Sequence, residues 1–220
     1  MLEESYEVVE AINEGSTEHL KEELGDVLLQ VVFHADIEKD AGRFDLDDVA
    51  DGICKKLIFR HPHVFGNGHA EDAREVMVSW EELKRQEKGQ ETYTDTLTSV
   101  AKTLPALWRA EKVQKKAQKA GFDWPDVTGA MDKLYEEIGE LKEAIVDDSN
   151  IEEELGDLLF AAVNVSRFVE KDPEAALSKA TEKFITRFRK VEEYAREEGK
   201  DMAGMELADL DKLWEKAKKS

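Results

Sequence analysis

Apolar positions recur at helical spacing along most of this chain, and polar breaks divide the pattern into segments. Residues 2–14 form one amphipathic pattern that Gly15 closes, and Ser16 and Thr17 can cap the segment that follows. The same periodicity predicts further helices over about 17–39, 46–60, 71–89, 107–120, 127–147, 150–171, 173–198 and 206–218. No segment shows the alternation of a convincing strand, so the sequence predicts an all-α fold.

Three breaks organise these segments. His61-Pro62-His63-Val64-Phe65-Gly66 and Gly121-Phe122-Asp123-Trp124-Pro125 interrupt the helical pattern with proline and glycine. The polar stretch 89–96 is the best candidate for a linker. We therefore expect an N-terminal domain over residues 1–95 and a C-terminal domain over residues 96–220.

Composition and charge narrow the classes of partner. The chain has 220 residues, 37% of them charged, and a formal net charge of −20. Such a charge repels polymeric nucleic acid and acidic membranes, and no apolar run reaches the length of a membrane span. Because Cys54 is the only cysteine, no disulfide can form within the chain, and we expect a reducing cytoplasm. A phosphorylated substrate would also be repelled unless cations bridge it to the protein.

A repeated acidic pattern carries the candidate chemistry. Glu3-Glu4-Ser5-Tyr6-Glu7 precedes Glu22-Glu23-Leu24-Gly25-Asp26, and Glu136-Glu137-Ile138-Gly139-Glu140 precedes Glu153-Glu154-Leu155-Gly156-Asp157. A single E-x-x-E segment on a charged helix usually lies on a solvent-exposed face. Two matched copies in one chain instead favour a site that binds a divalent metal ion. We expect Gly25 and Gly156 to permit close packing against a neighbouring helix, since glycine costs roughly 1 kcal/mol in a helix interior.

The spacing of the acidic residues predicts that their carboxylates lie close together. Residues three apart share a helix face, and the short connection 147–150 makes the flanking helices antiparallel neighbours. Like charges about 4 Å apart repel by roughly 4 kcal/mol at an effective dielectric near 20, so the cluster needs cations. Oxygen ligands favour Mg²⁺ or Mn²⁺, and a di-iron site would want an E-x-x-H that the second half of the chain does not have. The predicted ligands are Glu137, Glu140, Glu154 and Asp157, with Glu4, Glu7, Glu23 and Asp26 as a second-site set.

Basic and aromatic residues repeat in the same order. Each acidic pattern is followed by a Lys–Arg pair one turn apart and then by a Trp–Lys pair, although either pair alone would be read as a solvated face or as core. Repeated in register, they predict donors for phosphate oxygens and a flat apolar surface for a base or ribose. The pairs are Lys56–Arg60 and Trp80–Lys84 in the first half, and Lys183–Arg187 and Trp214–Lys218 in the second.

On these motifs, the chain resembles the MazG family of nucleoside triphosphate pyrophosphohydrolases in its tandem two-domain form, over essentially its whole length. The segments Arg60–Gly66 and Gly121–Trp124 also look like family hallmarks. The resemblance implies an all-α fold, magnesium dependence, and homodimers in which paired helices build a four-helix-bundle-type site. It also implies that NTP and water react to give NMP and pyrophosphate.

Carried over by motif, the resemblance gives roles to individual residues. It keeps the four metal ligands predicted above for the C-terminal domain. The implied nucleotide contacts are Lys133, Glu136, Asn150, Glu153, Lys183, Arg187, Trp214 and Lys218. Lys133 fits physically, because it precedes Glu137 by one helical turn.

The start of the chain departs from the family pattern. Family members of this type usually carry an upstream segment with a Cys-Pro-Trp-Asp element, whereas this chain begins almost at Glu3. We therefore expect the N-terminal domain to be truncated at its start and its first ligand helix to fray. The C-terminal site is expected to be the working one. His61 and His63 have no cysteine or acid at zinc-ligand spacing, so they are interpreted as structural or as a lid on the N-terminal site.

The expected mechanism is metal-assisted hydrolysis of the α–β phosphoanhydride, with a glutamate that orients water. Glu136 and Glu153 are the two candidates, and the sequence leaves the choice between them open, as it does the base preference and the phosphorus attacked. The alternative is a non-catalytic acidic helical adaptor. That class explains the charge and the helices but not the ordered Lys–Arg and Trp–Lys repeats.

Overall fold

The computed structural model describes residues 1–65, 83–87 and 89–219, and it contains helices and no strand in that part of the chain. It divides into two compact units, Met1–Gly89 and Gln90–Ser220, each described here by itself. The predicted all-α class is confirmed. The expected domain boundary after residue 95 remains a prediction.

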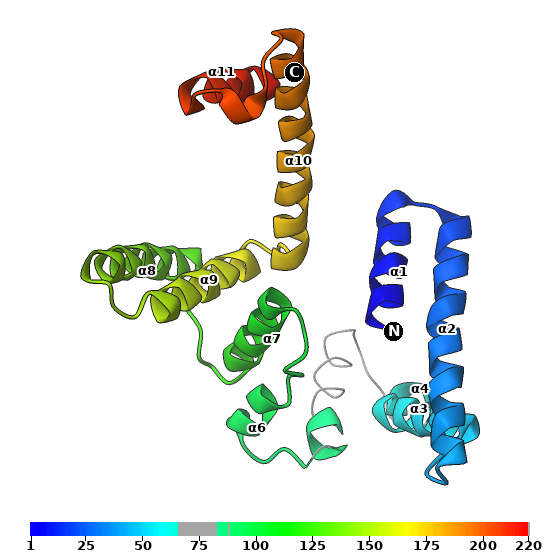
Figure 1. Cartoon of the computed structure of the whole chain (residues 1–220). Helices are drawn as coiled ribbons and strands as arrows, with labels where there is room; N and C mark the ends of the chain where they lie inside the picture. The colour runs from blue at the N-terminus through cyan, green and yellow to red at the C-terminus, as the bar shows by residue number, and fades with distance from the viewer. Residues whose placement is uncertain (66–82, 88, 220) are drawn as a thin grey trace. The chain divides into compact units, whose positions relative to one another are not determined.

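The first unit opens with two helices joined by a tight turn (Figure 1). Gly15 adopts φ 70° after the first helix, and the Ser16 hydroxyl caps the second by accepting the backbone N–H of His19 at 3.3 Å. Asp45 and Asp48 form a capping box at the start of the third helix. The helices are α1 (Leu2–Glu14), α2 (Thr17–Asp40), α3 (Leu46–Arg60) and α4 (Pro62–Phe65), and residues 83–87 are also helical.

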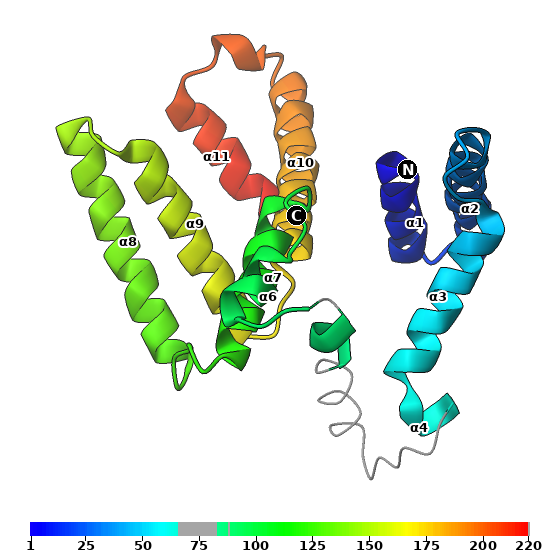
Figure 2. The same ribbon diagram turned by 90° about the horizontal axis from the view of Figure 1, so that it is seen from below.

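The most extensive helix pairings of the second unit (Figure 2) are those of α8 with α9, α11 with α10, and α7 with α9. Proline at the first position of α10 and the Asp172 carboxylate, which accepts the N–H of Ala175 at 2.8 Å, fix the start of α10 as the sequence predicts. The elements are α6 (Tyr93–Thr98), α7 (Ala106–Lys119), α8 (Val127–Asp147), α9 (Ile151–Phe168), α10 (Pro173–Glu197), the 3₁₀ turn η1 (Met202–Gly204) and α11 (Leu207–Ala217).

The packing between these helices is thin. No large side chain of the described residues is fully buried. The clearest core joins α10 and α11 through Val191, Ala195, Leu213 and Ala217. Between α7 and α9, the Gln114 amide donates to the backbone carbonyl of Phe160 at 2.8 Å. Much apolar surface is therefore still exposed on each unit.

Two local expectations differ from the structure. The expected linker is shortened because Thr92 and Asp95 form a capping box that starts α6 inside it. A methyl group on Gly25 or Gly156 would meet no atom within 4 Å among the described residues, so close packing within the chain does not explain either glycine. The helix expected over 71–89 lies largely outside the described residues. None of the described helices is long and apolar enough to cross a membrane.

Candidate functional site

The α8–α9 hairpin brings the predicted C-terminal acids together. Asp148 and Asn150 both adopt positive φ, at 50° and 53°, which these residue types tolerate better than most. The turn is therefore short, and α9 runs back beside α8 (Figures 1 and 2).

Three carboxylates meet across this hairpin. Glu137 and Glu140 on α8 and Glu154 on α9 each offer an oxygen, and these oxygens all lie within 4.8 Å of one another. Glu137 is only 5% exposed, Glu154 is half-buried and Glu140 is exposed. Asp157, the fourth expected ligand, is exposed and does not belong to this group in the described part of the chain.

Lys133 holds one side of the acidic cluster. Its ammonium group donates to Glu136 Oε1 at 2.7 Å and lies 2.6 Å from Glu137 Oε1. The hydrogen bonds to Glu136 and then to Glu137 raise the pKa of Lys133 above its ordinary value. The lysine is therefore a fixed positive charge beside the acids, on the face that the spacing predicts.

The second oxygen of Glu137 lacks a hydrogen-bond partner among the described residues. Glu137 Oε2 is buried and accepts no hydrogen bond from that part of the chain. A buried carboxylate oxygen without a hydrogen bond destabilises the fold. The pKa of Glu140 is raised by partial desolvation and, next, by the neighbouring Glu137. A bound divalent cation would satisfy the orphan oxygen and offset the repulsion, so this oxygen-only donor set fits Mg²⁺ or Mn²⁺.

The α1–α2 hairpin also brings three carboxylates together, but different residues surround them. Oxygens of Glu4, Glu7 and Glu23 also lie within 4.8 Å of one another, again without Asp26 in the described group. Glu23 is 9% exposed, and its Oε1 lies 3.1 Å from Nε2 of His19. Desolvation, and next the charge of Glu23, raise the pKa of Glu7. This cluster could also hold a metal ion.

The remaining predicted contacts of the C-terminal half occupy two places. Asn150 begins α9 without a side-chain cap bond, and Glu153 is exposed in the first turn of that helix. The basic and aromatic set (Lys183, Arg187, Trp214 and Lys218) lies instead on the α10–α11 pair.

Trp214, Lys218 and Arg187 of this set have neighbours on the α10–α11 pair. The Trp214 ring packs against Phe184 with centroids 5.1 Å apart, and Lys218 pairs with Glu215. The hydrogen bond from Lys218, and to a smaller extent the charge of Arg187, lower the pKa of Glu215. Within one protomer the acids and this basic set therefore occupy different helix pairs.

The corresponding residues of the first unit are placed differently. Arg60 is 6% exposed, and its guanidinium lies 2.6 Å from Glu87 Oε2. Lys56 is exposed and Lys84 is half-buried, whereas Trp80 lies outside the described residues, as does the side chain of His63. The pair between buried Arg60 and exposed Glu87 distinguishes this copy from the C-terminal one.

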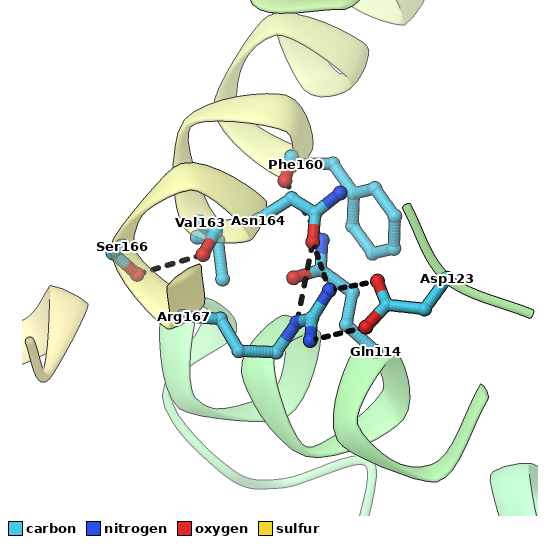
Figure 3. A network of polar contacts seen from close by, with 7 residues as sticks. All are labelled: Gln114, Asp123, Phe160, Val163, Asn164, Ser166 and Arg167. Atoms are coloured by element: carbon cyan, nitrogen blue, oxygen red, sulfur yellow. Dashed lines mark hydrogen bonds and ion pairs between the residues drawn. The ribbon is translucent and has the colours of Figure 1, made fainter. Parts of the chain in front are cut away.

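One polar network was not predicted from the sequence (Figure 3). Arg167 on α9 donates to both carboxylate oxygens of Asp123, and also to Asn164 Oδ1 at 2.8 Å from Nη2. The hydrogen bond from Arg167 is the main reason that the pKa of Asp123 is lowered. The sequence singled out the segment Gly121–Trp124 as a break and a family hallmark, but it did not indicate which residue of another helix Asp123 contacts.

Comparison with known proteins places these observations in context. A family model described as the MazG nucleotide pyrophosphohydrolase domain matches residues 1–65 and 126–194. The chain is 44% identical over 222 residues to the nucleoside triphosphate pyrophosphohydrolase of Escherichia coli strain K12, covering 99% of this chain and 84% of the relative.

A Thermotoga maritima protein named nucleoside triphosphate pyrophosphohydrolase/pyrophosphatase is 47% identical over 218 residues, covering 99% of this chain and 83% of the relative. An uncharacterized protein of Bacillus subtilis is 48% identical over 223 residues and covers this whole chain, which matches 45% of that protein. The matched segments of the family model include both acidic hairpins.

Proposed function

This chain belongs to the MazG nucleotide pyrophosphohydrolase family, and from that premise we propose that it hydrolyses nucleoside triphosphates to nucleoside monophosphates and pyrophosphate with a divalent metal ion. The observation that carries the proposal is the buried, unpartnered Oε2 of Glu137, which lies in a group of three converging carboxylates. In an acidic surface that binds no ligand, a buried carboxylate oxygen without a hydrogen bond would only destabilise the fold.

The α8–α9 hairpin is proposed as the working site, within a catalytic C-terminal domain. Glu137, Glu140 and Glu154 would hold the cation, with Asp157 completing the set once substrate is present. The cation, Mg²⁺ or Mn²⁺, would neutralise phosphate charge and polarise the anhydride that is cleaved. A chain of net charge −20 needs such a bridge to bind polyphosphate.

The protein side chains have separate proposed tasks. Glu136 or Glu153 would accept a hydrogen bond from the attacking water and orient it, because both are exposed beside the ligand set. Lys133 would keep Glu137 oriented through its 2.6 Å contact and could turn toward phosphate oxygens, while Asn150 would donate from the start of α9.

A homodimer would complete the site. Exposed apolar side chains flank the acids on the α8–α9 hairpin, and a second hairpin could cover them as a four-helix bundle: Tyr135, Leu155 and Leu159. The open surface at Gly156 agrees with close approach by another helix. The second copy would also bring Lys183, Arg187, Trp214 and Lys218 of one protomer toward the acids of the other. Sedimentation should give a dimer, and an active monomer would contradict this arrangement.

The reaction is tested with purified protein and a panel of NTPs. We expect pyrophosphate and NMP as the first products with Mg²⁺, and no turnover after chelation. Initial release of orthophosphate, or a rate that ignores the chelator, would overturn the proposed chemistry. The absence of any turnover, together with capture of a helical protein partner, would favour the adaptor. Cys54 is exposed and free, which agrees with the cytoplasm as the proposed compartment.

A further inference from the structure

Helix α10 carries two of the proposed phosphate contacts, Lys183 and Arg187, and a long part of it is exposed. Every residue from 175 to 186 is exposed to solvent. Near its C-terminal end, α10 packs on α11 through Val191 and Ala195. Because α11 moves together with α10, this packing does not fix the pair to the rest of the unit. The contacts that place the basic side chains within one protomer must therefore lie where α10 begins.

The beginning of α10 is fixed to α7. Pro173, the first residue of α10, is buried, and Asp172 before it caps the helix. The indole N–H of Trp108 on α7 donates to both carboxylate oxygens of Asp172, at 3.0 Å to each. Apart from α11, the most extensive packing of α10 among the described helices is with α7 (Figure 1). One carboxylate thus caps α10 and also fastens this cap to α7.

Helix α7 is fixed in turn to the helix that carries part of the acidic group. The side chain of Gln114, six residues after Trp108 on α7, is 7% exposed. Its amide donates to the backbone carbonyl of Phe160 on α9. Glu154 lies six residues before Phe160 on the same helix. Short contacts through α7 therefore join the helix of Glu154 to the start of α10.

The length of α10 makes its basic residues sensitive to the direction in which the helix starts. Lys183 and Arg187 follow Pro173 by about 15 and 21 Å along the helix axis. A rotation of about 4° at the start displaces a group 15 Å away by about 1 Å. A displacement of about 1 Å can cost roughly 100-fold in rate. One hydrogen bond at the start of α10 can therefore control contacts made much further along it.

We propose that Trp108 and Asp172 are positioning residues for the phosphate-binding side chains Lys183 and Arg187. Their hydrogen bond fixes the direction of α10, and α10 places both cations against the polyphosphate of the substrate. Trp108 and Asp172 act through α10 and do not themselves contact the substrate. This inference rests on the proposed nucleotide chemistry and adds to it two residues from outside the acidic and basic motifs.

Trp108→Phe tests the hydrogen bond, because it removes the indole N–H and keeps an aromatic ring. Affinity for inorganic tripolyphosphate with Mg²⁺, measured by calorimetry, should fall about tenfold, as expected for a displacement of less than 1 Å. KM for NTPs should rise by a similar factor while kcat changes less than about twofold, because a contact made equally to substrate and transition state affects KM alone. Mn²⁺ affinity without nucleotide depends on the acids of α8 and α9 and should stay unchanged.

A double-mutant cycle separates positioning from a general loss of stability. In a protein that already carries Lys183→Gln and Arg187→Gln, Trp108→Phe should lower tripolyphosphate affinity by less than about twofold, since no cation is left to misplace. Asp172→Ser breaks the same hydrogen bond from the other side. Serine retains a cap acceptor for α10 but lacks the two carboxylate oxygens that Trp108 contacts. It should reproduce the effect of Trp108→Phe, and it decides the question if Trp108→Phe does not fold.

Tyr93→Phe is the matched control, because it removes a polar hydrogen from an exposed aromatic side chain of α6. It should change none of these quantities. Unchanged tripolyphosphate affinity in folded Trp108→Phe and Asp172→Ser overturns the positioning role, even if NTPs are hydrolysed. An equal loss with and without Lys183 and Arg187 overturns it as well, as does a wild-type protein that binds no tripolyphosphate. Coupled losses in a protein that releases no pyrophosphate from NTPs support the positioning role and refute the proposed reaction.

Discussion

The two acidic hairpins, α1–α2 and α8–α9, share their motif but differ in what surrounds it. Each gathers three glutamates within 4.8 Å. In the C-terminal hairpin, Lys133 contacts one oxygen of Glu137, and the other oxygen is buried without a partner in the described part of the chain. In the N-terminal hairpin, the most buried acid, Glu23, already contacts His19. The same spacing therefore brings the carboxylates together in both hairpins, while the neighbouring residues differ in how far they compensate the negative charge.

The basic repeats show the same divergence. Arg60 and Arg187 occupy equivalent places in the sequence pattern, yet Arg60 is buried against Glu87 whereas Arg187 is half-buried on α10 near Glu215. The buried guanidinium of Arg60 would lose its carboxylate partner if it turned toward a phosphate, which is costly for a buried charge. This difference supports the proposal that the second unit, rather than the first, carries the working site.

Glu140→Gln should give the largest effect and tests this comparison directly. It removes one ligand charge while keeping the shape of the side chain, so NTP hydrolysis should fall by about 100-fold or more, equivalent to roughly 2.7 kcal/mol. Steady-state pyrophosphate release with Mg²⁺ measures it. Circular dichroism should show an unchanged helical content, and activity near the wild-type rate would remove the C-terminal hairpin from the chemistry.

The Asp123–Arg167 pair provides a second test, specific to the C-terminal unit. The lowered pKa of Asp123 means that the pair stabilises the fold fully above the unfolded pKa, near 4, and that this contribution is lost as the pH falls through the folded pKa. Asp123→Asn should cost about 3 kcal/mol of unfolding free energy at pH 7, because it leaves Arg167 buried without its carboxylate.

Urea unfolding between pH 7 and pH 2.5 measures this difference, which should shrink toward zero at the acidic end. Hydrogen exchange should become faster on α7 and α9 and stay unchanged on α1 and α2. A difference between wild type and Asp123→Asn that is independent of pH would show that the ion pair does not account for it.

Much of the helical fold could be predicted from local signals, and the site only in part. Gly15, Asp45 and Asp172-Pro173 end or begin helices through contacts within a few residues, so their positions are readable in the sequence. Convergence of Glu137, Glu140 and Glu154 follows from helical spacing and one short turn. These predictions need no knowledge of distant contacts.

The failures involve residues far apart in the chain. Arg60 meets Glu87 and Asp123 meets Arg167 across 27 and 44 positions, and periodicity does not specify such pairs. No sequence motif singled out Asn164, whose orientation is fixed by hydrogen bonds from Arg167. The open surfaces of Gly25 and Gly156 also show that a glycine in a helix does not reveal which neighbour, if any, approaches it.

Glu7→Gln should give the smallest effect and decides whether the first hairpin takes part at all. In the first hairpin His19 already contacts Glu23, whereas Glu137 beside Glu140 has a buried oxygen without a partner among the described residues, so the loss of one acidic charge should matter less at Glu7 than at Glu140. Neutralising it should also relieve repulsion from Glu23 and Glu4, the charges that raise its pKa. We therefore expect less than about a threefold loss of pyrophosphate release. Equal losses from Glu7→Gln and Glu140→Gln would mean that the hairpins are coupled, and a loss from Glu7→Gln alone would move the active site to the first unit.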